Sequence, residues 1–101
     1  MEISWSEIAW DDYLYWQTQD KKTLKKINSL IKDSIKNGTS GIGHPEILKG
    51  DLLGWCSKTI DKANRFVFRI QDDKLEILQC RTDQGLMILP LSFVESRGNN
   101  I

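Results

Sequence analysis

The residues of this chain that could do chemistry are few, and they point to proton transfer beside a phosphate. Glu46 is the candidate base, since a carboxylate can take the proton of an RNA 2′-hydroxyl. Arg65 carries the planar fork of donors that suits a phosphate, and Lys49 lies three residues beyond Glu46. Cleavage of RNA through its own 2′-hydroxyl needs such a base, a cation at the phosphate and an acid for the departing 5′ oxygen. The alternative is that Glu46 is an ordinary loop carboxylate and Arg65 a surface strand residue.

We expect neither a metal nor a cofactor. Two cysteines, Cys56 and Cys80, are too few for a cysteine-based zinc site, and the one histidine, His44, lacks partners at metal-binding spacing. The glycines between positions 38 and 43 are not followed by the Lys-Ser/Thr pair of a phosphate-binding loop. The first residues do not resemble a signal peptide, so we expect a cytoplasmic protein with reduced cysteines that serve as small core residues.

The composition predicts one small globular domain with an uneven charge distribution. The chain has 101 residues, with 14 Lys+Arg against 14 Asp+Glu. Residues 1–20 carry five acids and no Lys or Arg, whereas residues 21–65 carry ten bases against four acids. Such a basic segment is typical of a one-sided surface for a polyanion, although a solvated helix face gives the same pattern. The longest apolar run, residues 86–91, is too short to span a membrane.

The N-terminal half predicts two helices after a short strand at residues 3–5. Ser6 followed by Glu7 is typical of a helix N-cap, and this helix would run to about Thr18. Asp20 is a second N-cap candidate. The apolar residues that follow it, to Ile35, recur at three- and four-residue spacing, which indicates an amphipathic helix. We expect the two helices to form an antiparallel hairpin.

The C-terminal half predicts three strands, at residues 54–60, 64–70 and 75–81, joined by hairpin-length connections. In the middle strand, Phe66 and Phe68 alternate with Arg65 and Arg69, so one face is apolar and the other presents arginines. The expected fold class is therefore α+β, with two N-terminal helices packed on one face of a small antiparallel sheet and a ligand-binding surface on the open face.

Several motifs together resemble one known family, and they cover residues 1–81 almost without gaps. They are Ile3-x-Trp5-Ser6-Glu7, Trp10-Asp11-Asp12-Tyr13-Leu14-Tyr15-Trp16, Lys25-Lys26-Ile27-Asn28-x-Leu30-Ile31-Lys32-Asp33, Gly41-x-Gly43-x-Pro45-Glu46-x-Leu48-Lys49, Leu53-Gly54-x-x-Ser57, Arg65-x-Val67 and Cys80-Arg81. This sequence resembles the Txe/YoeB toxins of the RelE/ParE superfamily, and the Trp-Asp-Asp-Tyr-x-x-Trp block is the most specific element. A gyrase-directed toxin of the ParE branch is disfavoured, because Glu46 and Arg65 match the nuclease pattern.

The resemblance implies a RelE-like fold and a metal-independent, ribosome-dependent mRNA endonuclease that cuts at the A-site codon. It implies a Phd/YefM-type antitoxin as partner, operator DNA bound only through the antitoxin complex, and a homodimer as one oligomeric state. By position, Glu46 would be the general base and Arg65 the phosphate-stabilising residue, with Lys49 assisting and Lys58 contacting a phosphate. Trp5, Trp10 and Trp16 would be core residues, whereas Trp55 is left as a candidate base-stacking residue.

The sequence departs from this family at its C-terminal end. Such toxins typically finish after Cys-Arg with Tyr-His-Tyr, which serves in acid catalysis and base stacking, whereas this chain has Thr82-Asp83-Gln84 and continues to Ile101. We therefore expect a toxin domain at 1–81, an atypical tail at 82–101 and attenuated cleavage. His44 and Asp83 are the candidate substitute acids. The second hypothesis is a non-catalytic protein that binds antitoxin or ribosome and contributes to operator repression.

Smaller departures are Thr59, where such toxins usually carry Arg, and His44, where they commonly carry Lys. In the tail, the apolar residues 86–91 and Phe93 need cover. They would either add an edge strand up to Pro90 or be buried at a dimer contact. The remaining alternative is that the tail at 82–101 is disordered.

Overall fold

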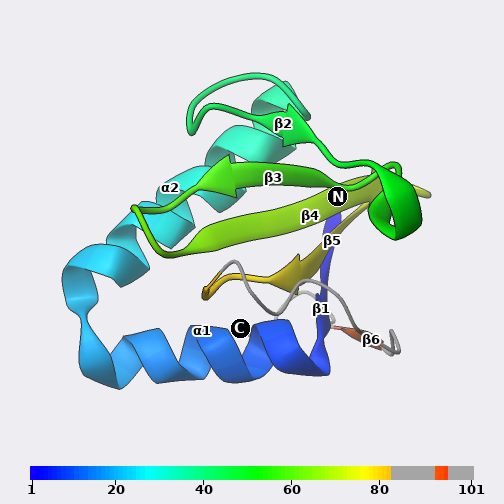
Figure 1. Ribbon diagram of the computed structural model, residues 1–101. Coiled ribbons are helices and arrows are strands. Elements are labelled where there is room, and N and C mark those ends of the chain that lie inside the picture. Colours follow the sequence, from blue (N-terminus) through cyan, green and yellow to red (C-terminus); the bar gives the residue numbers. More distant parts are fainter. Residues whose placement is uncertain (83–92, 96–101) are drawn as a thin grey trace.

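The computed structural model describes residues 1–82 and 93–95, which form an α+β domain with helices on one side of a sheet (Figure 1). In chain order the elements are β1 (Glu2–Ser6), α1 (Glu7–Gln19), α2 (Lys21–Asn37), β2 (Glu46–Ile47), the 3₁₀ turn Gly50–Leu52, β3 (Cys56–Thr59), β4 (Arg65–Gln71), β5 (Lys74–Gln79) and β6 (Phe93–Glu95). The expected fold class is confirmed.

Both predicted N-caps begin the helices. The Ser6 hydroxyl accepts a hydrogen bond from the backbone N–H of Ala9 at 2.9 Å and donates one to the Leu78 carbonyl at 2.6 Å. Asp20 accepts from the backbone N–H groups of Lys22 and Thr23. Each cap satisfies amide groups that have no partner inside the helix. The two helices splay apart from Asp20 rather than lying side by side as a hairpin, so α2 crosses the sheet obliquely (Figure 1).

The sheet has the strand order β2-β3-β4-β5-β1-β6 and is mixed rather than purely antiparallel. The predicted hairpins are antiparallel, but β1 pairs with β5 in parallel, with Ile3 opposite Leu75. The long connection through both helices permits this, because parallel neighbours need a crossover rather than a tight turn. Part of the tail, β6, pairs with β1 at the sheet edge; the apolar residues 86–91 lie outside the described residues.

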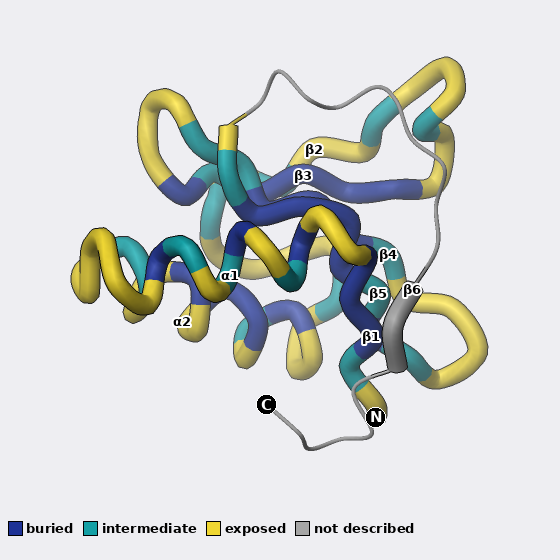
Figure 2. The backbone as a smooth tube through the Cα atoms, turned by 90° about the horizontal axis from the view of Figure 1, so that it is seen from below, coloured by how far each residue is buried: buried dark blue, intermediate teal, exposed yellow. Residues whose placement is uncertain are grey.

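Apolar side chains gather on both faces of the sheet. The main cluster joins both helices to the sheet and includes Ala9, Ile27, Phe66 and Phe68, all fully buried. A smaller cluster of Trp55, Val67 and Leu78 lies apart from it. Figure 2 shows the buried backbone running through the central strands and the inner turns of the helices.

The sheet face that we expected to be open is therefore covered in part, because Leu48 and Leu52, from the segment between β2 and β3, pack against the smaller cluster.

Neither α1 nor α2 is long and apolar enough to cross a membrane.

Candidate functional site

The strand register brings Glu46 and Arg65 to the same face of the sheet. Glu46 pairs with Ser57 on β3, and Ser57 pairs with Val67 on β4. Directly paired residues point to the same side of a sheet, and so do residues two apart on one strand. Arg65 therefore shares a face with Val67, Ser57 and Glu46, opposite the face that the helices cover.

Arg65 is the first residue of β4, two residues before Val67 of the smaller cluster. Its side chain is half-buried, and Nη1 donates a hydrogen bond to the Thr59 hydroxyl at 3.2 Å. Thr59 is the paired residue on β3. Thr59 is a neutral partner, and no carboxylate of the described residues is bonded to the Arg65 guanidinium.

The segment around Glu46 is exposed. Glu46 lies in β2, the two-residue edge strand, and His44 and Lys49 on either side of it are exposed as well. His44 has a positive φ of 50°, which is uncommon for a residue other than glycine. The segment therefore presents a carboxylate, an imidazole and an ammonium to solvent at one edge of the sheet.

The end of β5 is tied to the start of β4, next to Arg65. The Thr82 N–H donates to the Asn64 side-chain oxygen at 2.6 Å, and the Gln79 amide donates to the carbonyls of Arg81 and Thr82. Asn64 directly precedes Arg65, so the chain leaves the sheet beside the candidate phosphate ligand. Asp83, a candidate acid, lies outside the described residues.

The prediction that Lys58 contacts a phosphate is wrong. Its side chain is fully buried, and its ammonium is bound inside the protein by Asp33, Ser34 and Gly38. Lys58 pairs with Phe66 on β4, so alternation directs it to the helix-covered face. That pairing was the available signal, since Phe66 was already assigned to the core.

The prediction that Trp55 stacks on a base is also corrected. Trp55 is 3% exposed within the second cluster, and the Arg69 guanidinium lies 4.3 Å from the centre of its ring. Arg69 in turn forms an ion pair with Glu76. The indole therefore packs the open face instead of offering a free ring to a nucleotide.

Helix α1 holds the end of β5 from the other side, through residues of the Trp-Asp-Asp-Tyr-x-x-Trp block. The Cys80 N–H donates to the Asp12 carboxylate at 3.0 Å, and the Trp16 indole N–H donates to the Cys80 carbonyl at 2.8 Å. Burial raises the pKa of Asp12 to about 6. The sequence analysis placed Trp16 in the core but assigned no role to Asp12, whose backbone contact no sequence pattern indicates.

Both cysteines are free and buried, as predicted. Burial raises the pKa of the Cys56 thiol, and that of Cys80 well above its ordinary value. Little thiolate therefore forms at neutral pH, and neither thiol is suited to nucleophilic chemistry.

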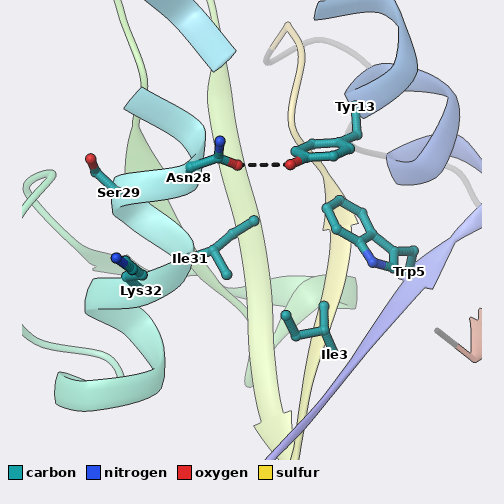
Figure 3. A pocket seen from close by; sticks show the side chains of 7 residues that line it. All are labelled: Ile3, Trp5, Tyr13, Asn28, Ser29, Ile31 and Lys32. Carbon is teal, nitrogen blue, oxygen red and sulfur yellow. Dashed lines mark hydrogen bonds between the residues drawn. The ribbon is translucent and has the colours of Figure 1, made fainter. Parts of the chain in front are cut away.

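A groove of about 500 Å³ lies between the two helices, on the other side of the molecule (Figure 3). Apolar side chains such as Trp5 and Ile31 line it, and the Tyr13 hydroxyl donates to Asn28 across it at 2.8 Å. Lys32 is the charged residue of its lining, and burial raises the pKa of Tyr13. Among the described residues that line the groove, no carboxylate accompanies Lys32, so the groove lacks the base and cation that the candidate site on the open face combines.

Comparison with known proteins identifies the family. Residues 5–83 match the family model described as the YoeB-like toxin of bacterial type II toxin-antitoxin systems. Toxin YoeB of Escherichia coli K12 is 49% identical over 81 residues, which are 80% of this chain and 96% of that protein. Toxin YoeB of Streptomyces coelicolor is 43% identical over 80% of this chain and 96% of its own length.

Solved structures agree. A YoeB/ParE toxin from Agrobacterium tumefaciens superposes with a TM-score of 0.79 at 40% identity, covering 81% of this chain and 98% of that one. A YoeB in complex with YefM from Staphylococcus aureus gives a TM-score of 0.76 at 41% identity, covering 80% and 94%. The resemblance noted from the sequence is confirmed, and this chain belongs to the YoeB toxins of bacterial type II toxin-antitoxin systems.

Proposed function

We propose that this toxin is a ribosome-dependent mRNA endonuclease that cuts at the A-site codon without a metal. The observation that carries the proposal is the register of β2, β3 and β4, which puts Glu46 on β2 and Arg65 on β4 on the same face of the sheet, the one that the helices leave uncovered. In this mechanism Glu46 takes the proton of the 2′-hydroxyl, which then attacks the adjacent phosphorus. Arg65 stabilises the negative charge that develops on the phosphate oxygens, and Lys49 assists from the same edge.

The third requirement is an acid for the departing 5′ oxygen, and the residue at the expected position is a poor acid. Thr82, tied to Asn64 beside Arg65, stands where the family resemblance expects the first residue of Tyr-His-Tyr. A threonine hydroxyl does not donate a full proton near neutral pH, so we propose that cleavage is attenuated. The remaining acids to consider are His44, on the Glu46 segment, and Asp83.

We also propose a Phd/YefM-type antitoxin as partner, because the Staphylococcus aureus relative was solved with YefM. Operator DNA would be bound only through that complex. A homodimer is a further proposal, supported by the solved YoeB dimer of Staphylococcus aureus.

The test is mRNA cleavage on programmed ribosomes by the full chain and by a version with Thr82→Tyr, Asp83→His and Gln84→Tyr that ends there. We expect the second version to cut at the A-site codon and the full chain to cut far more slowly. Glu46→Gln and Arg65→Gln should each lower the rate of the active version at least about 100-fold. If neither version cuts while both still bind ribosomes, the non-catalytic function replaces this one.

If the full chain cuts as fast as the restored version, the attenuation is wrong and another acid is present. His44→Ala and Asp83→Asn in the full chain would then identify it, since only the variant that lacks the acid should lose activity.

A further inference from the structure

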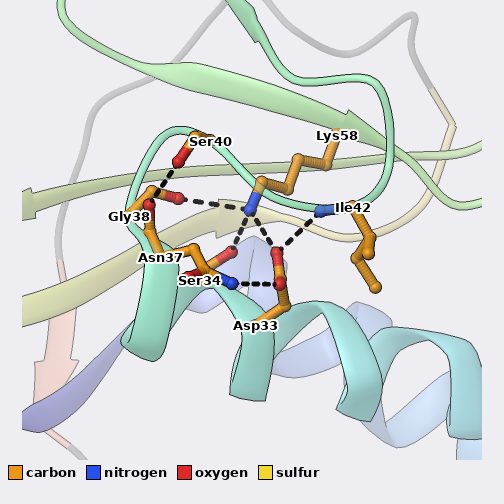
Figure 4. Close-up of polar contacts among 7 residues, drawn as sticks. All are labelled: Asp33, Ser34, Asn37, Gly38, Ser40, Ile42 and Lys58. Atoms are coloured by element: carbon orange, nitrogen blue, oxygen red, sulfur yellow. Dashed lines mark hydrogen bonds and ion pairs between the residues drawn. The ribbon is translucent and has the colours of Figure 1, made fainter.

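A buried cation links β3 to the end of α2, and it is Lys58, the residue first assigned to phosphate binding. Its Nζ donates to the Asp33 carboxylate at 3.0 Å, to the Ser34 hydroxyl at 3.0 Å and to the Gly38 carbonyl at 3.2 Å (Figure 4). An ammonium has three N–H donors, so these three acceptors use all of them. The side chain is fully buried, and none of its charge is directed to solvent.

Asp33 extends this link to the loop that follows α2. Besides Lys58, its carboxylate accepts from the Asn37 side chain at 2.7 Å and from the backbone N–H of Ile42 at 3.0 Å. Figure 4 shows the loop curving around the ammonium, so that one ion pair contacts the helix, the strand and the loop together.

The loop lies against this pair closely enough to require glycine. A Cβ on Gly43 would lie 2.9 Å from Leu30 Cδ2 and 3.0 Å from Lys58 Cβ, and one on Gly41 would overlap the Asp33 carboxylate. Both glycines also have positive φ values, which other residues rarely adopt. The Gly43 carbonyl then accepts from the Thr59 N–H at 2.7 Å, which fixes the loop to β3 just before β2 begins.

The loop at residues 38–43 leads directly to the strand that carries Glu46. Gly43 lies three residues before Glu46 in the chain. It is hydrogen-bonded to Thr59, whose hydroxyl accepts a hydrogen bond from Arg65. The loop anchored by Asp33 and Lys58 therefore ends next to both proposed catalytic residues. A shift of the loop would move Glu46 relative to Arg65, and displacements of about 1 Å in such sites can lower rates about 100-fold.

We propose that Lys58 and Asp33 are positioning residues, which fix the loop at residues 38–43 and thereby hold Glu46 in place on the face of the sheet that carries Arg65. The catalytic part of this inference rests on the proposed function, whereas the anchoring of the loop does not. Lys58 itself touches no RNA in this scheme. The competing explanations are a direct phosphate contact by Lys58 and an ion pair that supports the whole fold without favouring this loop.

The anchoring is tested by amide hydrogen exchange in the full chain, comparing the parent protein with Lys58→Met, Asp33→Asn and the double variant. We expect the amides of Ile42 and Thr59 to exchange at least about tenfold faster in each variant, while those of Phe68 and Ile77 in the central strands accelerate far less. Lys62→Met is the matched control, because Lys62 is an exposed lysine just beyond β3 and should change none of these rates. Asp33→Asn retains an acceptor for Lys58 and serves if Lys58→Met does not fold.

The positioning role is tested by cleavage kinetics in whichever version of the protein cuts. We expect Lys58→Met and Asp33→Asn to lower kcat at least about tenfold with little change in KM, and the double variant to be no slower than the worse single one. A phosphate contact would instead raise KM, weaken the salt dependence and leave Asp33→Asn active.

Unchanged exchange at Ile42 and Thr59 overturns the anchoring, and so does acceleration spread evenly over all strands. Faster exchange with unchanged kcat overturns the positioning role alone. If no version cuts, the proposed function and the catalytic part of this inference fail together, while the exchange data still decide whether the loop is anchored.

Discussion

The two faces of the sheet hold their cations in opposite ways. On the helix-covered face, Lys58 is fully buried and its three donors meet a carboxylate, a hydroxyl and a carbonyl. On the other face, Arg65 is half-buried and donates to the neutral hydroxyl of Thr59. A cation taken out of water must be paired, so the charge of Lys58 is neutralised within the fold. In the described part of the chain no carboxylate is bonded to Arg65, as its proposed role at a phosphate requires.

A difference of one residue along β3 decides which face of the sheet a side chain occupies. Lys58 and Thr59 are neighbours, and alternation sends the first toward α2 and the second toward Arg65. Residue type alone does not distinguish a ligand-binding cation from a structural one. The distinction comes from the face of the strand and from what covers that face.

The largest expected effect is on packing in the helix-covered face, between its centre and its end. Phe68→Ala removes a fully buried ring from the main cluster and should lower the free energy of unfolding by about 3–5 kcal/mol. Ile70→Ala is the control: Ile70 is two residues further along β4 and 38% exposed, so its loss should be near 1 kcal/mol. Urea denaturation measures both. Equal losses would contradict the assignment of the core to the middle of β4.

The sequence predicted the helix-covered face well because local signals were sufficient there. Ser6 and Asp20 cap the helices as expected, and the alternation from Arg65 to Phe68 assigns β4 correctly. The same alternation, extended across the pairing to β3, would have assigned Lys58 to the core.

Other features had no local signal. The parallel pairing of β1 with β5 depends on where the chain returns after the helices, and β2 has only two residues, too few to show a period. The sequence analysis assigned Glu46 and Arg65 to one site from their chemistry and the family resemblance. The register that puts them on one face depends on the pairing of three strands, which no local pattern shows.

A second difference concerns Asp12, a carboxylate that the helix-covered side buries without a cation bonded to it in the described part of the chain. Its pKa rises from 3.8 to about 6 through burial. Between these values the folded protein keeps a proton that the unfolded chain has released. The free energy of unfolding attributable to Asp12 therefore falls as the pH rises through this window, by an amount on the order of 2 kcal/mol.

Asp12→Asn keeps an oxygen for the Cys80 N–H and removes this titration. We expect the variant to gain stability relative to the parent between pH 4 and pH 7, measured by urea denaturation at each pH. Taking the difference between the two proteins cancels Asp20 and Asp33, whose lowered pKa values act in the opposite direction. A constant difference across this range would show that Asp12 is ionised in the folded protein throughout.

A smaller effect on stability is expected from Arg69, a cation on the open face that has a charged partner. Arg69 lies over the Trp55 ring and forms an ion pair with Glu76 while remaining partly exposed. Arg69→Ala should cost about 1 kcal/mol, and part of this cost should disappear in 1 M salt because solvent-accessible ion pairs are screened. Asp33→Asn, measured in the same way, should lose stability that salt does not restore. Equal salt sensitivity would remove the distinction between the two faces.

The smallest effects on stability are expected at the proposed catalytic residues. Glu46 is exposed and Arg65 bonds a hydroxyl that water can replace, so Glu46→Gln and Arg65→Gln should each change the free energy of unfolding by less than about 0.5 kcal/mol. The same variants should lower the cleavage rate of the active version at least about 100-fold. This combination separates a charge held for a ligand from one used in the fold, since Lys58→Met is expected to lower both stability and kcat. A large loss of stability in Arg65→Gln would mean that the open face, like the covered one, uses its cation for folding.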